Sequence, residues 1–171
     1  MNINFIAILV AALVPMVLGF IWYHPKAFGS AWMKHAGMTE EKAKSGNMIL
    51  IFGLSFVFSL MLAMAMNTIA YHDGFVSGAL YYVTENHSMK PEAGSEAAKW
   101  LDYYATNLSA SNRTFKHGAF HGFFIAGLFI ALPIMATNAL FERKSFKYVA
   151  VNMGYWLLCF AIMGAIVAGW K

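Results

Sequence analysis

The amino-acid sequence predicts an all-α, polytopic membrane protein with four transmembrane helices in two antiparallel hairpins. The chain of 171 residues is 60% hydrophobic and only 12% charged, whereas soluble domains are about 25% charged. The charged residues avoid four stretches of 19 to 23 residues, which are 5–23, 48–70, 118–140 and 148–170. Because a helix needs roughly 20 apolar residues to cross a bilayer, each stretch can form one span.

A single membrane domain, 1–171, is expected. The two larger connections, 24–47 and 71–117, are too short to hold a second folded domain of ordinary size. The net charge is +4, and the basic residues mostly flank the spans, where they contact lipid head groups. Membrane lipids are therefore expected as partners, and nucleic acid is not.

The basic residues of the short loops predict the orientation of the chain. The connection 24–47 holds four lysines, and 141–147 holds three basic residues. Short loops rich in Lys and Arg stay in the cytoplasm. Both termini and the loop 71–117 are therefore expected on the outer side, which in a Gram-negative bacterium is the periplasm.

The first span and its exit carry a proline and several aromatic residues. Pro15 is expected to kink the helix in the membrane. Trp and Tyr are typical of the membrane–water interface, and four of them stand near the ends of spans. These predicted interfacial aromatics are Trp22, Tyr23, Trp32 and Trp170.

The connection 24–47 is expected to form two short helices. The first would lie on the membrane surface and end at Gly37. Thr39 would cap the second, with Glu40 and Glu41 in the first turn, where the helix dipole favours acids. This second helix is expected to lead into the second span.

Small and weakly polar residues recur every four residues in three of the spans. Such rows let neighbouring helices approach closely. The predicted packing residues are Ser55 and Ser59 in the second span, Gly118, Gly122 and Ala126 in the third, and Gly164 and Ala168 in the fourth. Met66 is expected on a different face of the second span.

The outer loop, 71–117, is expected to be partly helical. Ser95 would cap an amphipathic helix, one face of which carries apolar and aromatic side chains. These are Ala97, Trp100, Leu101, Tyr104 and Leu108. The helix would either cover the outer ends of the bundle or dock a partner.

Polar residues near the cytoplasmic ends of the spans are expected to form a cluster beside the Trp22 to Pro25 corner. They are His24, Asn47, Asn138, Glu142 and Asn152. Asn138 and Asn152 lie close to the short third loop and are predicted to hydrogen-bond across the hairpin. A lock of this kind is favoured over a ligand site.

Histidines at the outer ends of the spans are the strongest candidates for chemistry. His117 and His121 are four residues apart, so they share one helical face and can bind one metal ion. His72 and Asp73, at the outer end of the second span, lie at the same membrane level and are the further candidate ligands, since imidazoles with a carboxylate suit zinc, copper or iron. The alternative is that these histidines only hydrogen-bond to head groups, water or a neighbouring helix.

Two separated motifs carry a resemblance to a known family. The first is Gly19-Phe20-Ile21-Trp22-Tyr23-His24-Pro25, followed by Phe28-Gly29 and Trp32-Met33-Lys34. The second is Leu140-Phe141-Glu142, followed by Val151-Asn152-Met153-Gly154-Tyr155, Met163-Gly164-Ala165-Ile166 and Trp170. Together they resemble the signatures of a small family of bacterial four-helix membrane proteins of unknown function. The resemblance implies four helices and no particular activity, and the length of the outer loop departs from the family's pattern.

Three functional hypotheses remain open. No charged residue lies within a span, although such residues usually mark ion-coupled transport, and no catalytic motif is present, so an enzyme is not expected. The leading hypothesis is a non-catalytic accessory or assembly subunit of the bacterial inner membrane, without a cofactor, which binds another membrane protein or a second copy of itself. The alternatives are a metal- or haem-binding membrane protein and a small oligomeric transporter or channel.

Overall fold

The computed structural model describes residues 4–81, 84 and 91–170, and within them it is an all-α protein with four long apolar helices. The first two are α1 (Phe5–Trp22) and α4 (Met48–Ala70). The third, Phe115–Phe141, is continuous over three segments, and the fourth is α10 (Phe146–Gly169). Each of the four overlaps one charge-free stretch of the sequence over most of its length, which confirms the predicted all-α polytopic fold.

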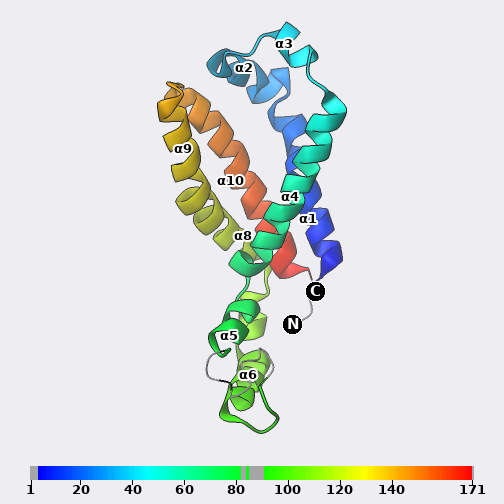
Figure 1. Cartoon of the computed structure of the whole chain (residues 1–171), viewed down its shortest axis with the longest axis vertical. Coiled ribbons are helices and arrows are strands. Elements are labelled where there is room, and N and C mark those ends of the chain that lie inside the picture. The colour runs from blue at the N-terminus through cyan, green and yellow to red at the C-terminus, as the bar shows by residue number, and fades with distance from the viewer. Residues whose placement is uncertain (1–3, 82–83, 85–90, 171) are drawn as a thin grey trace.

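The four helices form two antiparallel hairpins that meet at α10 (Figure 1). One hairpin is α1 with α4, and the other is the third helix with α10. Because α10 also packs against α1 and α4, it is the central helix of the bundle. Small side chains such as Ala11 and Ala63 are completely buried between the helices, together with Met163 and Cys159.

The third helix changes its winding along its length. It consists of α8 (Phe115–His121), a π-helical segment η2 (Gly122–Ala131) and α9 (Leu132–Phe141). The Leu132 N–H bonds to the carbonyl of Gly127, five residues back, as in a π-turn. Pro133 follows, and because proline crowds the preceding turn, the wider turn accommodates its ring.

The third and fourth long helices begin before the charge-free stretches 118–140 and 148–170. The Thr114 side chain accepts a hydrogen bond from the His117 N–H and starts α8. Ser145 accepts one from the Tyr148 N–H in the same way and starts α10. Each cap adds a polar first turn to an apolar helix.

At one end of the bundle, the first connection folds over the helices, and we call this the α2 end (Figure 1). It contains a tight turn over Pro25–Gly29, then α2 (Ser30–Ala36) and α3 (Glu40–Lys44). Gly29 is required in the turn because a Cβ there would overlap the Tyr23 carbonyl oxygen. Gly37 ends α2 in the left-handed conformation, with φ of 72°.

The capped helix of this connection leads into the second span, but the two are separate helices. Thr39 does cap α3, but α3 ends at Lys44. The Asn47 side chain then accepts a hydrogen bond from the Leu50 N–H and caps α4 separately. Gly46 lies between the two helices and favours a break there because glycine is a poor helix former.

At the opposite end, which we call the α6 end, a helical segment extends beyond the bundle (Figure 1). It contains α5 (Asp73–Ala79), α6 (Glu96–Asn107) and α7 (Ser109–Asn112). Ser95 caps α6 by accepting from the Ala98 N–H, as the sequence predicted. The part of the outer loop that the structure describes is therefore largely helical.

Candidate metal centre

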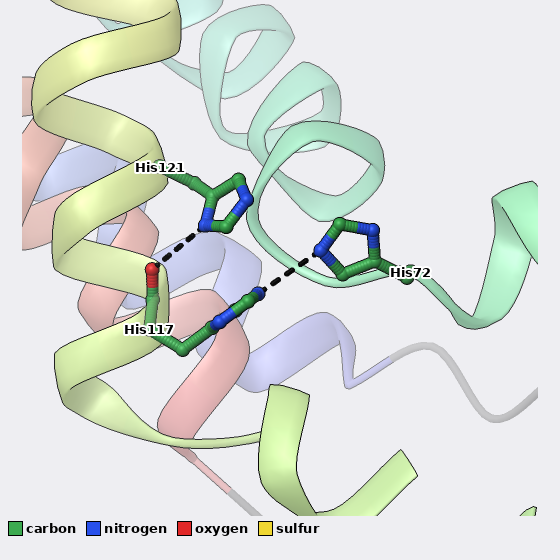
Figure 2. Close-up of side chains that lie close together, drawn as sticks. All are labelled: His72, His117 and His121. Atoms are coloured by element: carbon green, nitrogen blue, oxygen red, sulfur yellow. Dashed lines mark hydrogen bonds between the residues drawn. The ribbon is translucent and has the colours of Figure 1, made fainter. Parts of the chain in front are cut away.

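Three histidines come together where the α6 segment joins the bundle (Figure 2). His72 lies just after α4, and His117 and His121 lie on α8. Each can offer one ring nitrogen, and these three atoms all lie within 4.8 Å of one another. The Nε2 atoms of His72 and His117 are 3.0 Å apart, so in the metal-free protein one of them donates a proton to the other.

The local sequence explains how these residues are positioned. Tyr71 adopts an extended conformation that ends α4, so the chain turns and His72 faces α8 rather than continuing the helix. His117 and His121 are separated by one helical turn, which brings their ring centroids to 4.1 Å. All three side chains are half-buried, so they remain reachable from the α6 end.

The hydrogen bond of His121 fixes its tautomer in the form that suits a metal ligand. Its Nδ1 lies 3.1 Å from the His117 carbonyl oxygen, which can only accept, so Nδ1 carries the proton. In the neutral ring, Nε2 then has a free lone pair. Histidines that bind metals commonly donate their other N–H to a backbone carbonyl in this way.

The spacing of the nitrogens is close to what a metal ion requires. With Zn–N bonds of about 2.0–2.1 Å, tetrahedral ligands lie roughly 3.3 Å from each other. The His72–His117 pair is already within that distance. The widest separation among the three nitrogens is no more than 4.8 Å. Three imidazoles would leave one position for water or another ligand.

Asp73, which the sequence suggested as a fourth ligand, has different partners. Its carboxylate accepts hydrogen bonds from the hydroxyls of Tyr104 and Ser109, at 3.2 and 3.0 Å. Its second oxygen pairs with Arg113 at 3.4 Å. Burial raises the pKa of Tyr104, so this hydroxyl keeps its proton and remains a donor. Asp73 therefore fastens α6 and α7 to the start of α5.

The small residues of the third and fourth spans lie where α8 and η2 cross α10. A Cβ at Gly118 would overlap the Gly164 carbonyl oxygen, and a Cβ at Gly122 would overlap that of Phe160. Ala126 and Ala168 are also buried. The backbones of the two helices are thus in direct contact.

In α4 the packing face differs from the predicted row. Ser59 is buried, but Ser55 is exposed. The buried residues of this helix are Ser59, Ala63, Met66 and Ala70, so Met66 belongs to the face from which the sequence excluded it. The buried face of α4 differs from the predicted row because α4 packs against both α1 and α10.

The polar cluster expected at the α2 end is assembled only in part: Asn152 and His24 line the same space beside the Trp22 to Pro25 corner. Asn138 and Glu142 are exposed on the third helix and its loop, and His24 and Asn47 act as local caps for Lys26 and Leu50. Asn152 does not bond to Asn138. It donates to the Tyr148 carbonyl and accepts from the Tyr23 hydroxyl, because its side chain faces α1.

The aromatic residues near the first span also point inward. The Trp22 indole donates to the Val151 carbonyl at 3.1 Å, and its ring covers Gly154. Trp32 packs edge-on against Tyr23, with centroids 5.4 Å apart. Trp170, at the opposite end, is 42% exposed. Trp22, Tyr23 and Trp32 are thus partly buried, and Trp170 is the most exposed of the four.

The two motifs that carry the family resemblance meet in the structure and form a joint between α1 and α10. Tyr23 bonds to Asn152, and nearby in the same two motifs Trp22 packs against Gly154. Tyr155 donates a short hydrogen bond, 2.7 Å, to the Pro15 carbonyl. The tertiary structure thus explains why residues about 130 positions apart belong to one signature.

A cavity of about 810 Å³ beside this joint was not foreseen from the sequence. Its walls come from α1, α2, α4 and α10. Tyr23, His24, Asn152 and Tyr155, all in the two motifs, line it. The concentration of these four residues in the two motifs was the sequence signal for a site here. The remaining walls come from residues outside the motifs, which the sequence did not connect with them.

The four apolar helices and their hairpin arrangement define a multi-pass membrane protein of the all-α class. More particularly, the chain belongs to the family described as "Protein of unknown function (DUF1761)", whose model matches residues 6–168. The resemblance drawn from the two motifs is confirmed by this match. No curated protein and no solved structure matches the chain.

Proposed function

We propose that this membrane protein binds a transition-metal ion through His72, His117 and His121. The observation that carries the proposal is the convergence of three imidazole nitrogens within 4.8 Å. Imidazole suits Zn²⁺, copper, iron and nickel, and the hydrogen bond from His121 to a backbone carbonyl supports its role as a ligand. The proposal adopts what the sequence offered only as an alternative.

We propose binding rather than catalysis at this site. A three-histidine zinc site with an open position can activate water, but hydrolysis also needs a group that moves protons. Among the described residues, Asp73 is the carboxylate next to the cluster in sequence, and its oxygens are occupied by Tyr104, Ser109 and Arg113. This arrangement supports a binding role.

Metal analysis of the purified full-length protein tests the proposal. After loading with Zn²⁺ and removal of excess metal, we expect one ion per chain in the wild type. His117→Ala and His121→Ala should each lower the retained metal by at least about tenfold, because two remaining imidazoles bind weakly.

His35→Ala is the matched control, because His35 lies at the α2 end and bonds to Ser145. It should retain metal like the wild type. A wild-type protein without affinity for Zn²⁺, Cu²⁺, Fe²⁺ or Ni²⁺, or unchanged binding after both cluster substitutions, would contradict the proposed function.

A second candidate function is that of an accessory or assembly subunit, and the exposed face of α6 favours it. Trp100 and Tyr103 are 61% and 56% exposed on a helix that lies beyond the bundle. Aromatic side chains of this kind are typical of protein interfaces. Detergent co-purification should recover a stoichiometric partner that Trp100→Ser removes and the exposed control Asp102→Ser retains. Equal recovery with both variants would contradict this role for α6.

We also propose that the protein lies in a bacterial inner membrane with the α6 end facing the periplasm. Support comes from the connections at the α2 end, which hold seven basic residues and three acidic ones. Alkaline phosphatase fused after Asn112 should be active, and the same enzyme fused after Arg143 should be inactive. The reverse pattern would overturn the orientation.

A further inference from the structure

We propose that the cavity at the α2 end binds an anionic glycerophospholipid, with an acyl chain inside the cavity and the head group against basic residues beside α2. This site is separate from the three histidines, which lie at the opposite end of the bundle. The proposal therefore does not depend on metal binding.

The volume and walls of the cavity fit a hydrocarbon chain. Its volume of about 810 Å³ lies within the range of roughly 300–1,000 Å³ that is usual for small-molecule sites. The walls are largely apolar and come from several helices. They include Gly19, Phe20, Phe52, Phe58, Trp32 and Trp156.

The cavity lies in the part of the bundle that the bilayer surrounds. Phe20 and Phe58 line it from two spans and are 65% and 58% exposed, so the same side chains also face lipid. The rings of Phe20 and Phe52 stack with centroids 5.5 Å apart and bridge α1 and α4. An acyl chain can therefore enter from the bilayer without leaving an apolar environment.

Near α2 the cavity lining includes His24, and basic residues lie close in sequence to the lining residues there. His24 and Pro25 line it there, Lys26 follows them directly, and Lys34 lies on α2 with the lining residue Trp32. Both lysines are exposed. Lysines at a membrane surface attract anionic lipids.

Two other lysines of this end are engaged elsewhere. Lys44 forms an ion pair with Glu40 at 3.3 Å, and Lys144 donates to the Ala36 carbonyl at 2.8 Å. Lys26 and Lys34 are the exposed basic residues nearest in sequence to the lining residues His24, Pro25 and Trp32, and the proposal assigns the head group to them. A transmembrane helix, about 10 Å across with its side chains, would contact only the mouth of this space, whereas a flexible chain can fill it.

Native mass spectrometry of the full-length protein in detergent tests the proposal. The probes are phosphatidylglycerol and phosphatidylcholine with identical acyl chains. We expect one phosphatidylglycerol per chain, preferred about fivefold for each lysine that contacts it. Soluble glycerol phosphate in excess should not displace the lipid. Equal retention of the two lipids, retention of neither, or displacement by glycerol phosphate would overturn the proposal.

Two sets of variants locate the lipid. Lys26→Gln combined with Lys34→Gln should abolish the preference for phosphatidylglycerol, whereas Lys99→Gln on α6 should retain it. Ser55→Trp places a large ring at the cavity wall and should lower retention of both lipids. The control Gly53→Trp, on the same helix where a Cβ meets nothing within 4 Å, should not.

Unchanged lipid preference in the double lysine variant would contradict the proposal. A photoreactive phosphatidylglycerol with its reactive group on the acyl chain provides a test in the wild-type protein. It should label peptides of α1 and α4 that contain Phe20 and Phe52. Labelling confined to other helices would overturn the assignment of the cavity. Because this test uses the wild-type protein, it holds even if the Ser55→Trp variant does not fold.

Discussion

At the scale of single residues, Asp73 connects the α6 segment to the bundle. Its carboxylate binds the Tyr104 and Ser109 hydroxyls and pairs with Arg113, and the Arg113 guanidinium also lies 5.0 Å from the centre of the Tyr71 ring. Because Asp73 follows His72 directly, the contacts that order the α6 segment also restrain one of the metal-binding candidates. The site and the segment are therefore structurally coupled.

Asp73→Asn tests this coupling. Asparagine keeps the size of the side chain but removes its charge, so we expect the α6 segment to lose about 1 kcal/mol of local stability, since these groups are partly exposed. Amide hydrogen exchange in α6 should become roughly fivefold faster, with little change in α10. Asp102→Asn, on the exposed face of α6, is the control and should leave the exchange unchanged. Equal rates in the two variants would contradict the role of Asp73.

Tyr23 makes a hydrogen bond that joins two helices. Its hydroxyl donates to Asn152 at 3.0 Å in the joint between α1 and α10. Tyr23→Phe should lower the free energy of unfolding by about 0.6 kcal/mol, and by no more than about 1.7 kcal/mol, because polar bonds between membrane helices contribute amounts of this size. Thermal unfolding in detergent measures the change. Tyr103→Phe on exposed α6 should have no effect, and an equal effect would exclude a specific bond.

At the scale of helices, glycine determines how closely α8, η2 and α10 approach. A Cβ at Gly122 would overlap the Phe160 carbonyl oxygen, and one at Gly164 would overlap that of Gly118. Backbone atoms cannot rotate away as a side chain does, so the helices must separate. The same contacts place α8 against the bundle and thereby position His117 and His121.

Gly122→Ala should therefore destabilise the bundle, by about 1–3 kcal/mol as for an overpacked core. Its thermal midpoint in detergent should fall, and the affinity for metal should weaken with it. Gly53→Ala is the matched control, since its Cβ would meet nothing within 4 Å. If the two alanine variants unfold at the same temperature, the close crossing at Gly122 does not limit stability.

At the scale of the whole molecule, a metal ion would connect the two hairpins. His72 comes from the hairpin of α1 and α4, whereas His117 and His121 belong to the hairpin of α10. A ligand that binds only the folded state stabilises it by mass action, by about 2.7 kcal/mol at a concentration 100 times its dissociation constant. Binding should thus oppose separation of the hairpins.

Thermal unfolding as a function of metal concentration measures this effect. The wild-type midpoint should rise steadily with added Zn²⁺, and a chelator should reverse the rise. His72→Ala should abolish the response, because the ion would then bind within α8 alone. A metal-independent midpoint in the wild type would contradict a site that joins the hairpins.

The elements that depend on nearby residues were predictable. The four spans follow from local apolarity, and the caps at Thr39 and Ser95 were predicted because each acts within a single turn of its own helix. The caps at Asn47 and Ser145, and with the first of them the break between α3 and α4, were not predicted. The pairing of His117 with His121 was also predictable, since one helix positions both.

The sequence by itself determined the class of protein, the number of spans and the residue types available for chemistry, because partition into a bilayer depends on the composition of each segment. Only the tertiary structure decided which residues meet. His72 and His117 are 45 residues apart, and Asp73 turns away to Tyr104. The lipid cavity likewise needs four helices. These tertiary contacts depend on how each helix is rotated about its axis. That rotation is set by close contacts between helices, such as the contact of Gly118 with Gly164.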